Sequence, residues 1–243
     1  MVNPIKKAVQ KVYKSLKKNK LENSEGVYNE WAKEKEGSVD FFEKKLHKGS
    51  MDKRLNSKAK LRKDVRGYLP KDQKELKLLD VGAGPITRLG YNWEDRIIHI
   101  EAVDVNGDLY QKLFKKHNIT PPVITKNSEA EKIHELYEGE TFDFAFSRNA
   151  LDHCYDPIKG IKNMVDLIKP QRYAVLLHRR NEGLSQGYRG AHLWNFDVEQ
   201  DQVIVYNPSK KYKLREELSG VEVQYKLEQT PKDEWIYVEI FKK

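Results

Sequence analysis

Three histidines follow two neighbouring apolar segments, at positions where a proton-accepting group could act. His153 comes shortly after residues 142–146, His178 ends residues 173–178, and His192 lies in the loop that follows. A neutral imidazole accepts a proton near neutral pH, which suits the removal of a hydroxyl proton. We therefore take these three histidines as the catalytic candidates. The alternative role for His153 is to orient neighbouring loops.

A glycine-rich turn follows a buried strand and offers a place for a nucleotide-like ligand. The apolar run 76–81 leads into Gly82, Ala83 and Gly84. Glycines let the backbone turn sharply and let a ligand approach it closely. A dinucleotide site needs a third glycine three residues after Gly84, where Thr87 stands, and no Gly-Lys-Ser/Thr sequence follows. The turn therefore argues against NAD, FAD and a phosphate-binding loop.

An acidic residue ends the next apolar segment. Asp104 closes the run that starts at residue 97. A carboxylate there can accept two hydrogen bonds from a ribose diol. Ligands of such folds lie at the carboxyl ends of the strands, so Asp104 and the glycine turn are expected to serve one ligand.

Together these segments resemble the motifs of class I S-adenosylmethionine-dependent methyltransferases. The resemblance runs from about residue 76 to residue 178. Four segments carry it: residues 80–85, Asp104, residues 142–153 and residues 167–177. Gln171 and Arg172 replace two glycines that the family usually has in the last segment, so that turn is expected to differ in shape.

The resemblance implies S-adenosyl-L-methionine (SAM) as the cofactor, and it implies a role for each matching residue. The implied cofactor contacts are, around the methionine part, Asp80, Gly82, Ala83 and Gly84; at the ribose, Asp104 and Val105; at the adenine, Ser128 and Glu129; and below the sulfonium, Ser147, Arg148 and Asn149. Asp152 and His153 would lie at the mouth of the substrate pocket.

The loop at residues 181–196 carries many side chains that bind sugars and anions. Three glycines lie beside tyrosine, arginine, histidine, tryptophan and asparagine. Aromatic rings stack on sugar faces, and arginine suits a phosphate or carboxylate. We predict that the acceptor is bound by Arg179, Tyr188, Trp194 and Asn195. This run resembles one in bacterial methyltransferases of surface-polysaccharide gene clusters.

Two structural alternatives remain for the same region. Leu193, Trp194 and Phe196 could be buried in an ordinary core hairpin. Arg179 and Arg180 could simply face solvent.

The composition fits a globular protein with a heavily charged surface. Hydrophobic residues make up 38% and charged residues 34%, with a formal net charge of +8. A net positive charge favours an acidic partner such as nucleic acid, a phosphorylated metabolite or an anionic membrane surface. The alternative is an ordinary solvated surface, of which interleaved lysines and glutamates are typical. The single Cys154 excludes an intrachain disulfide and fits the cytoplasm. No apolar run is long enough to span a bilayer, and no spacing of acids compels a metal site, so we predict none.

The order of apolar and helical patterns predicts the fold. From residue 75 to residue 178 short apolar runs alternate with helical stretches, which is typical of a parallel sheet covered by helices. Strands without long helices between them follow, at residues 193–206, 221–227 and 234–241. We therefore predict a Rossmann-like α/β fold with a mostly parallel seven-stranded sheet and an antiparallel C-terminal edge.

Helical patterns come before this sheet. They cover residues 3–20, residues 28–46 with an interruption at Gly37, and residues 55–68. We predict an N-terminal helical cap or lid at residues 1–70 and a methyltransferase domain at residues 71–243. The basic helix at residues 3–20 packs its apolar stripe on the domain or, as the alternative, contacts a membrane surface or a partner.

Three functions compete on the sequence alone. The leading hypothesis is O-methylation of a glycan, a sugar nucleotide or a phosphorylated small metabolite. The net charge supports an RNA methyltransferase as the second, although no base-handling motif follows residues 142–146 and no separate RNA-binding module is present. The third is a non-catalytic methyltransferase-fold partner protein. The sequence does not set the oligomeric state.

Overall fold

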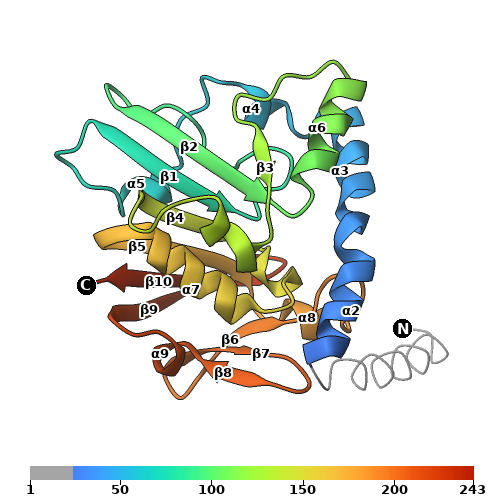
Figure 1. Ribbon diagram of the computed structural model, residues 1–243, viewed down its shortest axis with the longest axis vertical. Helices are drawn as coiled ribbons and strands as arrows, with labels where there is room; N and C mark the ends of the chain where they lie inside the picture. The colour runs from blue at the N-terminus through green and yellow to red at the C-terminus, as the bar shows by residue number, and fades with distance from the viewer. Residues whose placement is uncertain (1–23) are drawn as a thin grey trace.

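A mixed seven-stranded sheet forms the centre of the computed structural model, which describes residues 24–243 (Figure 1). Its strands are β1 (Glu75–Val81), β2 (Ile97–Asp104), β3 (Thr125–Asn127), β4 (Phe142–Arg148), β5 (Ile168–Arg179), β9 (Val221–Gln229) and β10 (Glu234–Lys242). Their order is β3-β2-β1-β4-β5-β10-β9. The first five strands in this order are parallel, and β10 and β9 are antiparallel to their neighbours. The predicted Rossmann-like sheet with an antiparallel C-terminal edge is confirmed.

Alternating side chains of the central strands enter cores on the two faces of this sheet. Leu76 and Leu78 of β1 pack with Phe144 of β4 on one face. Leu79 and Val81 enter the core on the other face. Successive side chains of a strand point to opposite faces, so a strand buried on both faces needs apolar residues at consecutive positions. This explains why β1 reads as a nearly continuous apolar run.

Helix α7 (Pro157–Leu167) covers the face that holds Leu79. It begins with a proline at its first position, and its N-cap Asp156 accepts a hydrogen bond from the Lys159 amide at 3.1 Å. Ile161 and Met164 are fully buried in the same core. The other helical segments after β1 are α6 (Gly107–Lys116), η2 (Ala130–Glu135), η3 (Leu151–His153), α8 (Glu182–Ser185) and α9 (Leu214–Glu217).

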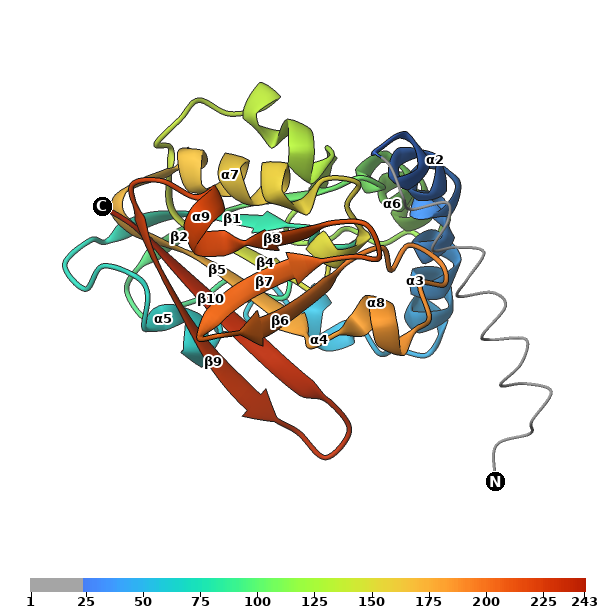
Figure 2. The same cartoon turned by 90° about the horizontal axis from the view of Figure 1, so that it is seen from below.

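A second, three-stranded antiparallel sheet packs below α7 (Figure 2). Its strands are β6 (Asn195–Glu199), β7 (Gln202–Tyr206) and β8 (Lys211–Lys213). Phe196 and Val205 join the core that contains Leu79. The predicted hairpin at residues 193–206 is confirmed by β6 and β7. It belongs to this separate sheet and not to the edge of the main sheet.

Helices at the start of the described chain lie beside α6 (Figure 1). They are α2 (Ser24–Glu34), η1 (Lys35–Gly37) and α3 (Ser38–His47), which together we call the cap. The predicted interruption near Gly37 is confirmed, because the short 3₁₀ turn η1 separates the two α-helices. Phe42 of α3 packs edge-on against Tyr110 of α6, with ring centroids 5.6 Å apart. This contact holds the cap at the end of β2.

The predicted helix at residues 55–68 is wrong. This region holds only two single turns, α4 (Asp52–Leu55) and α5 (Lys63–Arg66). Between them the chain makes a turn at residues 57–58 and then pairs with the segment around Asn92, where the Leu61 amide donates to the Asn92 carbonyl at 2.7 Å. Gly90 permits this close approach, since a Cβ there would lie 2.2 Å from the Lys60 carbonyl oxygen. Pairing with a distant segment therefore replaces the helix that the apolar spacing suggested.

Part of the predicted cap belongs to the core of the main sheet. Leu61, Val65 and Leu69 are buried against β1 and β4. The boundary at residue 70 stays a prediction. The basic helix predicted at residues 3–20 lies outside the described residues. Within residues 24–243, no helix combines the length and the apolar character that a bilayer span requires.

Candidate active site

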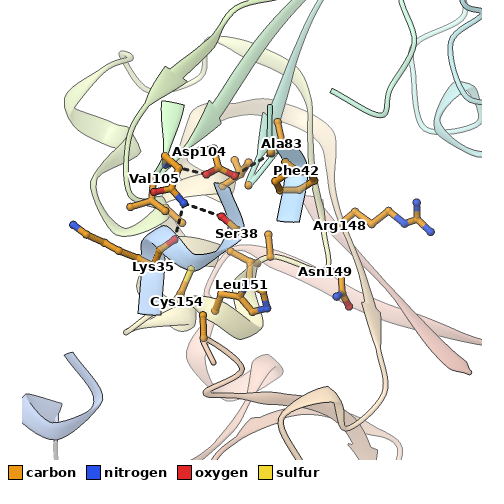
Figure 3. A pocket seen from close by; sticks show the side chains of 18 of the residues that line it. Lys35, Ser38, Phe42, Ala83, Asp104, Val105, Arg148, Asn149, Leu151 and Cys154 are labelled. Carbon is orange, nitrogen blue, oxygen red and sulfur yellow. Dashed lines mark hydrogen bonds between the residues drawn. The ribbon is translucent and has the colours of Figure 1, made fainter. Parts of the chain in front are cut away.

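A cavity of about 760 Å³ lies at the carboxyl ends of β1, β2 and β4, beneath the cap. Figure 3 shows Lys35, Ser38 and Phe42 of the cap on the same side of the cavity as Asp104 and Ala83. Most of the sequence-predicted residues line it: Asp80, Gly82, Ala83, Gly84, Asp104, Val105, Ser128, Glu129, Arg148, Asn149, His153, Arg179 and His192. The cavity therefore joins the expected cofactor segments to two of the three candidate histidines.

The glycine turn requires glycine for two different reasons. Gly82 and Gly84 have φ values of 70° and 66°, which other residues rarely adopt. A Cβ on Gly82 would lie 2.2 Å from the Cβ of Ala150, and one on Gly84 would lie 3.1 Å from the ring of Phe42. The amides of Gly82 and Ala83 donate to a carbonyl at the end of β2 and so fix the turn. The backbone is thereby presented bare to the cavity.

Asp80 stabilises this turn from below. Its carboxylate is buried and accepts a hydrogen bond from the Thr87 hydroxyl at 2.5 Å. Burial raises the pKa of Asp80, while the Thr87 hydroxyl and the charge of Arg54 act in the opposite direction. Thr87 stands where a dinucleotide site would have its third glycine, and here its side chain has a structural role.

Asp104 faces the cavity at the end of β2. One carboxylate oxygen accepts the Gly84 amide at 2.9 Å and the other accepts the Asn106 amide at 3.0 Å. Burial raises the pKa of this carboxyl despite these two bonds. Each oxygen still has a lone pair, so Asp104 can accept two more hydrogen bonds, as a ribose diol would donate.

The cap is hydrogen-bonded to Asn106, which follows β2 two residues after Asp104. Asn106 donates from its side-chain amide to the Lys35 carbonyl at 2.6 Å and to the Ser38 hydroxyl at 2.9 Å. The Ser38 hydroxyl also lies 3.1 Å from the hydroxyl of Tyr110. The side chain that holds the cap is therefore two residues from Asp104, so the cap is fixed at this end of the cavity.

Ser128 and Glu129, the predicted adenine contacts, lie next to Asp104 and line the cavity. The Ser128 amide donates to the Asp104 carbonyl at 3.0 Å. Glu129 is paired with Lys132 at 2.8 Å and accepts the Tyr155 hydroxyl at 3.2 Å. Trp31 of the cap stacks edge-on against Tyr155 and also lines the cavity, a contact that the sequence analysis did not find.

The three residues predicted below the sulfonium separate in the structure. Asn149 has a φ of 49°, and its side-chain oxygen accepts the Arg179 amide at 3.2 Å. Arg148 lines the cavity and lies over the ring of Trp235 at 4.9 Å. Ser147 is fully buried in β4 and does not line the cavity. Its neighbours in sequence therefore reach the site, while Ser147 does not.

The histidines converge on one buried carboxylate. An oxygen of Asp152 lies 2.8 Å from His192 Nδ1 and 3.2 Å from His153 Nε2, and these two nitrogens are 2.9 Å apart. The second oxygen lies 3.7 Å from Nδ1 of His178. Burial alone would raise the pKa of Asp152, but the charge of His153 and the three rings outweigh burial and hold that pKa well below its ordinary value. The three candidate histidines, which are distant in the sequence, thus lie around one carboxylate.

This arrangement leaves one ring nitrogen of each of the two cavity histidines turned away from Asp152. If both close nitrogens donate to the Asp152 oxygen, Nδ1 of His153 and Nε2 of His192 are the unprotonated atoms, a tautomer assigned from the hydrogen-bond pattern. The His153 side chain is 36% exposed and lines the cavity. Burial alone would lower the pKa of His153, but Asp152 outweighs it and raises that pKa. His153 therefore combines access to the cavity with raised basicity.

His178 has a different position. It is buried, does not line the cavity and stacks on Phe196 with ring centroids 3.9 Å apart. It faces Asp152 from behind. The structure thus gives this candidate base no surface on the cavity.

Two groups among residues 24–243 have ligand atoms within 4.8 Å of one another: Asp152 with His153 and His192, and Glu43 with His47 and His117. Such groupings also occur without an ion. The expectation that no metal is needed stays a prediction.

The loop after β5 is tied to the histidine group by its backbone. The amides of Leu193 and Trp194 both donate to the Asp152 carbonyl, at 2.9 and 3.1 Å. The indole of Trp194 donates to the Cys154 carbonyl at 2.9 Å. These bonds bring His192 to the cavity wall. They also bury Leu193 and Trp194, as the alternative of a core hairpin proposed.

The predicted acceptor contacts are therefore only partly brought to the cavity. Tyr188, Trp194 and Asn195 are buried and do not line it; the Asn195 amide donates to the Tyr188 hydroxyl at 3.0 Å. Their place is in the core beneath the second sheet. Arg179 does line the cavity, but it is paired with Glu182 and Asp233.

The residues present fit SAM. A bare glycine backbone, a carboxylate with two open acceptor positions and a long cavity beneath a cap occur together. The backbone of the glycine turn would hold the methionine part, Asp104 the ribose, and Ser128 with Glu129 the adenine.

Comparisons with known proteins agree with this geometry. Residues 51–224 match the model of a family described as a methyltransferase domain. A SAM-dependent methyltransferase from Aquifex aeolicus has a similar structure, with 17% identity, a TM-score of 0.45, and 82% of this chain and 96% of that chain covered. One from Methanosarcina mazei gives 15% identity, a TM-score of 0.44, and coverage of 75% and 99%.

A third similar structure contains a bound product of the cofactor. It is phosphoethanolamine N-methyltransferase 2 from Haemonchus contortus, in complex with phosphomonomethylethanolamine and S-adenosylhomocysteine (SAH). Identity is 13% and the TM-score 0.51, with 73% of this chain and 51% of that chain covered. No curated protein sequence matches the chain. Because the family model spans more than half of its residues, the chain belongs to the family of methyltransferase domains.

Proposed function

We propose that this enzyme methylates a hydroxyl oxygen of a small acceptor, and that His153 removes the hydroxyl proton. The observation that carries the proposal is the hydrogen-bonded group of Asp152, His153 and His192 in the wall of the cavity that holds Asp104. When bound, SAM supplies a methyl carbon activated by a positively charged sulfur. A hydroxyl is a weak nucleophile, so a base that takes its proton adds to the rate.

The chain's own groups handle the proton in a simple sequence. Asp152 orients the rings of His153 and His192 by accepting from both. The free Nδ1 of His153 accepts the proton of the acceptor hydroxyl. The resulting imidazolium is stabilised by the buried carboxylate, which stays ionised because its pKa is held low. The cap and residues 190–192 line the cavity in which this step would occur.

The acceptor class proposed is a glycan, a sugar nucleotide or a phosphorylated small metabolite. A cavity of about 760 Å³ is larger than a cofactor of this kind needs alone, which leaves room for a sugar-sized molecule. The resemblance of residues 181–196 to methyltransferases of surface-polysaccharide clusters supports the same class. The chain's basic character does not require nucleic acid, because its arginines at this site lie inside a cavity.

The test measures SAH production with UDP-glucose, glucose 1-phosphate and a neutral oligosaccharide as acceptors, and locates the new methyl by mass spectrometry and NMR. We expect an O-methyl product from at least one of them. His153→Gln should lower its kcat at least about 100-fold, the usual scale for loss of a general base. His134→Gln, an exposed histidine outside the cavity, is the control and should keep the wild-type rate. A product methylated on nitrogen or carbon, no product from any probe, or an unchanged rate in His153→Gln would contradict the proposal.

A further inference from the structure

Four cationic side chains line one part of the cavity, and the mechanism above uses none of them. They come from α3, α4, the loop after the glycine turn and the end of β4. We call these residues the basic wall: Lys45, Arg54, Arg88 and Arg148. They lie far apart in the sequence, so no sequence motif indicates that they lie together.

The basic wall has no carboxylate partner among residues 24–243 at ion-pair distance. Arg54 donates to the backbone carbonyls of Thr87 and Ala83, both at 3.3 Å. The buried Nε of Arg148 has no hydrogen-bond partner in the described chain. Lys45 lies 4.3 Å over the ring of Phe41. Backbone oxygens and rings therefore leave the positive charges uncompensated.

Several arginines outside the basic wall have acidic partners. Arg62 pairs with Asp64, and Arg180 pairs with Asp197 and Glu234. Arg179, the other arginine that lines the cavity, pairs with Glu182 and Asp233. The three arginines of the basic wall differ from it, because they have no acidic partner at ion-pair distance among the described residues.

The charges of the basic wall also act on one another. Burial first and the nearby charge of Arg88 second lower the pKa of Arg54 and of Arg148 to about 10. Asp80 is the carboxylate that opposes this effect at Arg54 and Arg88, and it is already bonded to Thr87. The cations stay charged at neutral pH and repel one another. An anion placed among them would remove that cost.

The basic wall has one part beside the cofactor and one part away from it. Arg54 is fixed to the glycine turn by its bond to Ala83, so a cofactor carboxylate there would be nearest to Arg54. Figure 3 shows Arg148 on the side of the cavity away from Asp104 and Val105. Its guanidinium lies against Trp235, which limits its rotation. Arg88 is exposed and close enough to lower the pKa of Arg148.

We propose that Arg88 and Arg148 bind a phosphate group carried by the acceptor, so that the substrate is a phosphate ester such as a sugar phosphate or a sugar nucleotide. The inference rests on the proposed function, and it assigns Arg148 to the acceptor in place of the cofactor. Two guanidinium groups match a doubly charged, multidentate phosphate better than a singly charged carboxylate. The phosphate would hold the acceptor while the sugar hydroxyl faces His153.

The test is calorimetric titration of inorganic phosphate, glucose 1-phosphate, acetate and glucose into the protein saturated with SAH. We expect phosphate and glucose 1-phosphate to bind, and acetate and glucose to bind at least about tenfold more weakly. Arg88→Gln and Arg148→Gln should each weaken glucose 1-phosphate binding by at least about tenfold, with SAH affinity within about twofold of wild type. Arg148→Lys keeps the charge but loses the forked arrangement of N–H donors. Its affinity for glucose 1-phosphate should lie between those of wild type and Arg148→Gln.

Arg66→Gln is the matched control, since Arg66 lies in α5 outside the cavity and donates to a backbone carbonyl. It should bind all four probes as wild type does. Retention of SAH binding shows that each variant is folded. Loss of SAH affinity without loss of phosphate binding would assign the basic wall to the cofactor and overturn the proposal. Equal binding of acetate, or phosphate binding unchanged in both glutamine variants, would also overturn it. No turnover is measured, so failure here is distinct from failure of His153 as a base.

Discussion

At the scale of single residues, Asp152 sets the proton affinity of the ring that faces the cavity. His153 is surrounded by Asp152 of η3, His192 of the following loop, Asp104 at the end of β2 and Glu182 of α8. Burial lowers its pKa, and the three carboxylates raise it, with Asp152 dominant. A general base must be neutral before it acts, so the rate should increase as the pH rises through this raised pKa.

Asp152→Asn should therefore shift the titration of His153 to lower pH. The substitution removes the charge that stabilises the imidazolium and keeps the side-chain size, so the folded-state pKa must fall. NMR titration of the His153 ring measures this without an acceptor, and the pH–rate profile should show its increase at lower pH in the variant. Asp108→Asn, an exposed acid outside the cavity, should leave the titration of His153 unchanged. A midpoint that stays or rises in Asp152→Asn would contradict the account.

Gly82→Ala should abolish SAH binding and lower the free energy of unfolding by more than Gly220→Ala does. Both glycines have φ near 70°, so each substitution costs about 1 kcal/mol of backbone strain. Only Gly82 adds a contact of 2.2 Å with the Cβ of Ala150, while Gly220 faces open space. Thermal unfolding with and without SAH compares them. Equal stability of the two variants would show that the close approach at Gly82 is not what requires glycine.

At the scale of elements, the sequence predicts strands better than it predicts the cap and the loops. The run 76–81 could only be a strand buried on both faces, and β1 occupies it. The apolar spacing at residues 55–68 was misleading, because Leu61 and Val65 are buried by long-range packing against the sheet and not along one helix. Long-range pairing of this kind leaves no periodic signal in a single sequence.

The candidate site also contains residues that the sequence predicts well and residues that it predicts poorly. Asp104 and Gly82 sit in a strand–turn pattern and were predictable from it. Tyr188 and Asn195 have side chains that suit a sugar, yet they satisfy one another in the core. Arg148 was predicted as a cofactor contact, but Lys45, Arg54 and Arg88 were missed, since only the folding of α3, α4 and the loop after β1 brings them to the same cavity. Residue type alone does not tell a binding side chain from a buried one.

Asn106 links the cap to the sheet, so Asn106→Ala should loosen the cap. The variant loses two hydrogen bonds, to the Lys35 carbonyl and the Ser38 hydroxyl, worth about 1 kcal/mol each. Hydrogen exchange of α2 and α3 should become faster while that of β1 and β4 stays the same. Asn118→Ala, at an exposed position after α6, serves as the comparison. Unchanged exchange in the cap of Asn106→Ala would mean that apolar contacts alone hold it.

At the scale of the whole molecule, the main sheet, the cap and the loop before the second sheet meet around one cavity. The main sheet supplies the glycine turn and Asp104, and the loop that leads into the second sheet brings His192 onto Asp152. The cap lies beside α6 (Figure 1) and is bonded to Asn106, two residues after Asp104. This organisation gives the cavity a cofactor end at Asp104 and an acceptor end at His153 and the basic wall.

Calorimetric titration of SAH into wild type, Asp104→Ala and His153→Gln tests this division most directly. We predict that Asp104→Ala weakens SAH binding at least about tenfold, because it removes a charged acceptor of the ribose hydroxyls. His153→Gln should bind SAH within about twofold of wild type, because its loss affects the acceptor end. Full SAH affinity in Asp104→Ala, or a tenfold loss confined to His153→Gln, would contradict the assignment of the two ends.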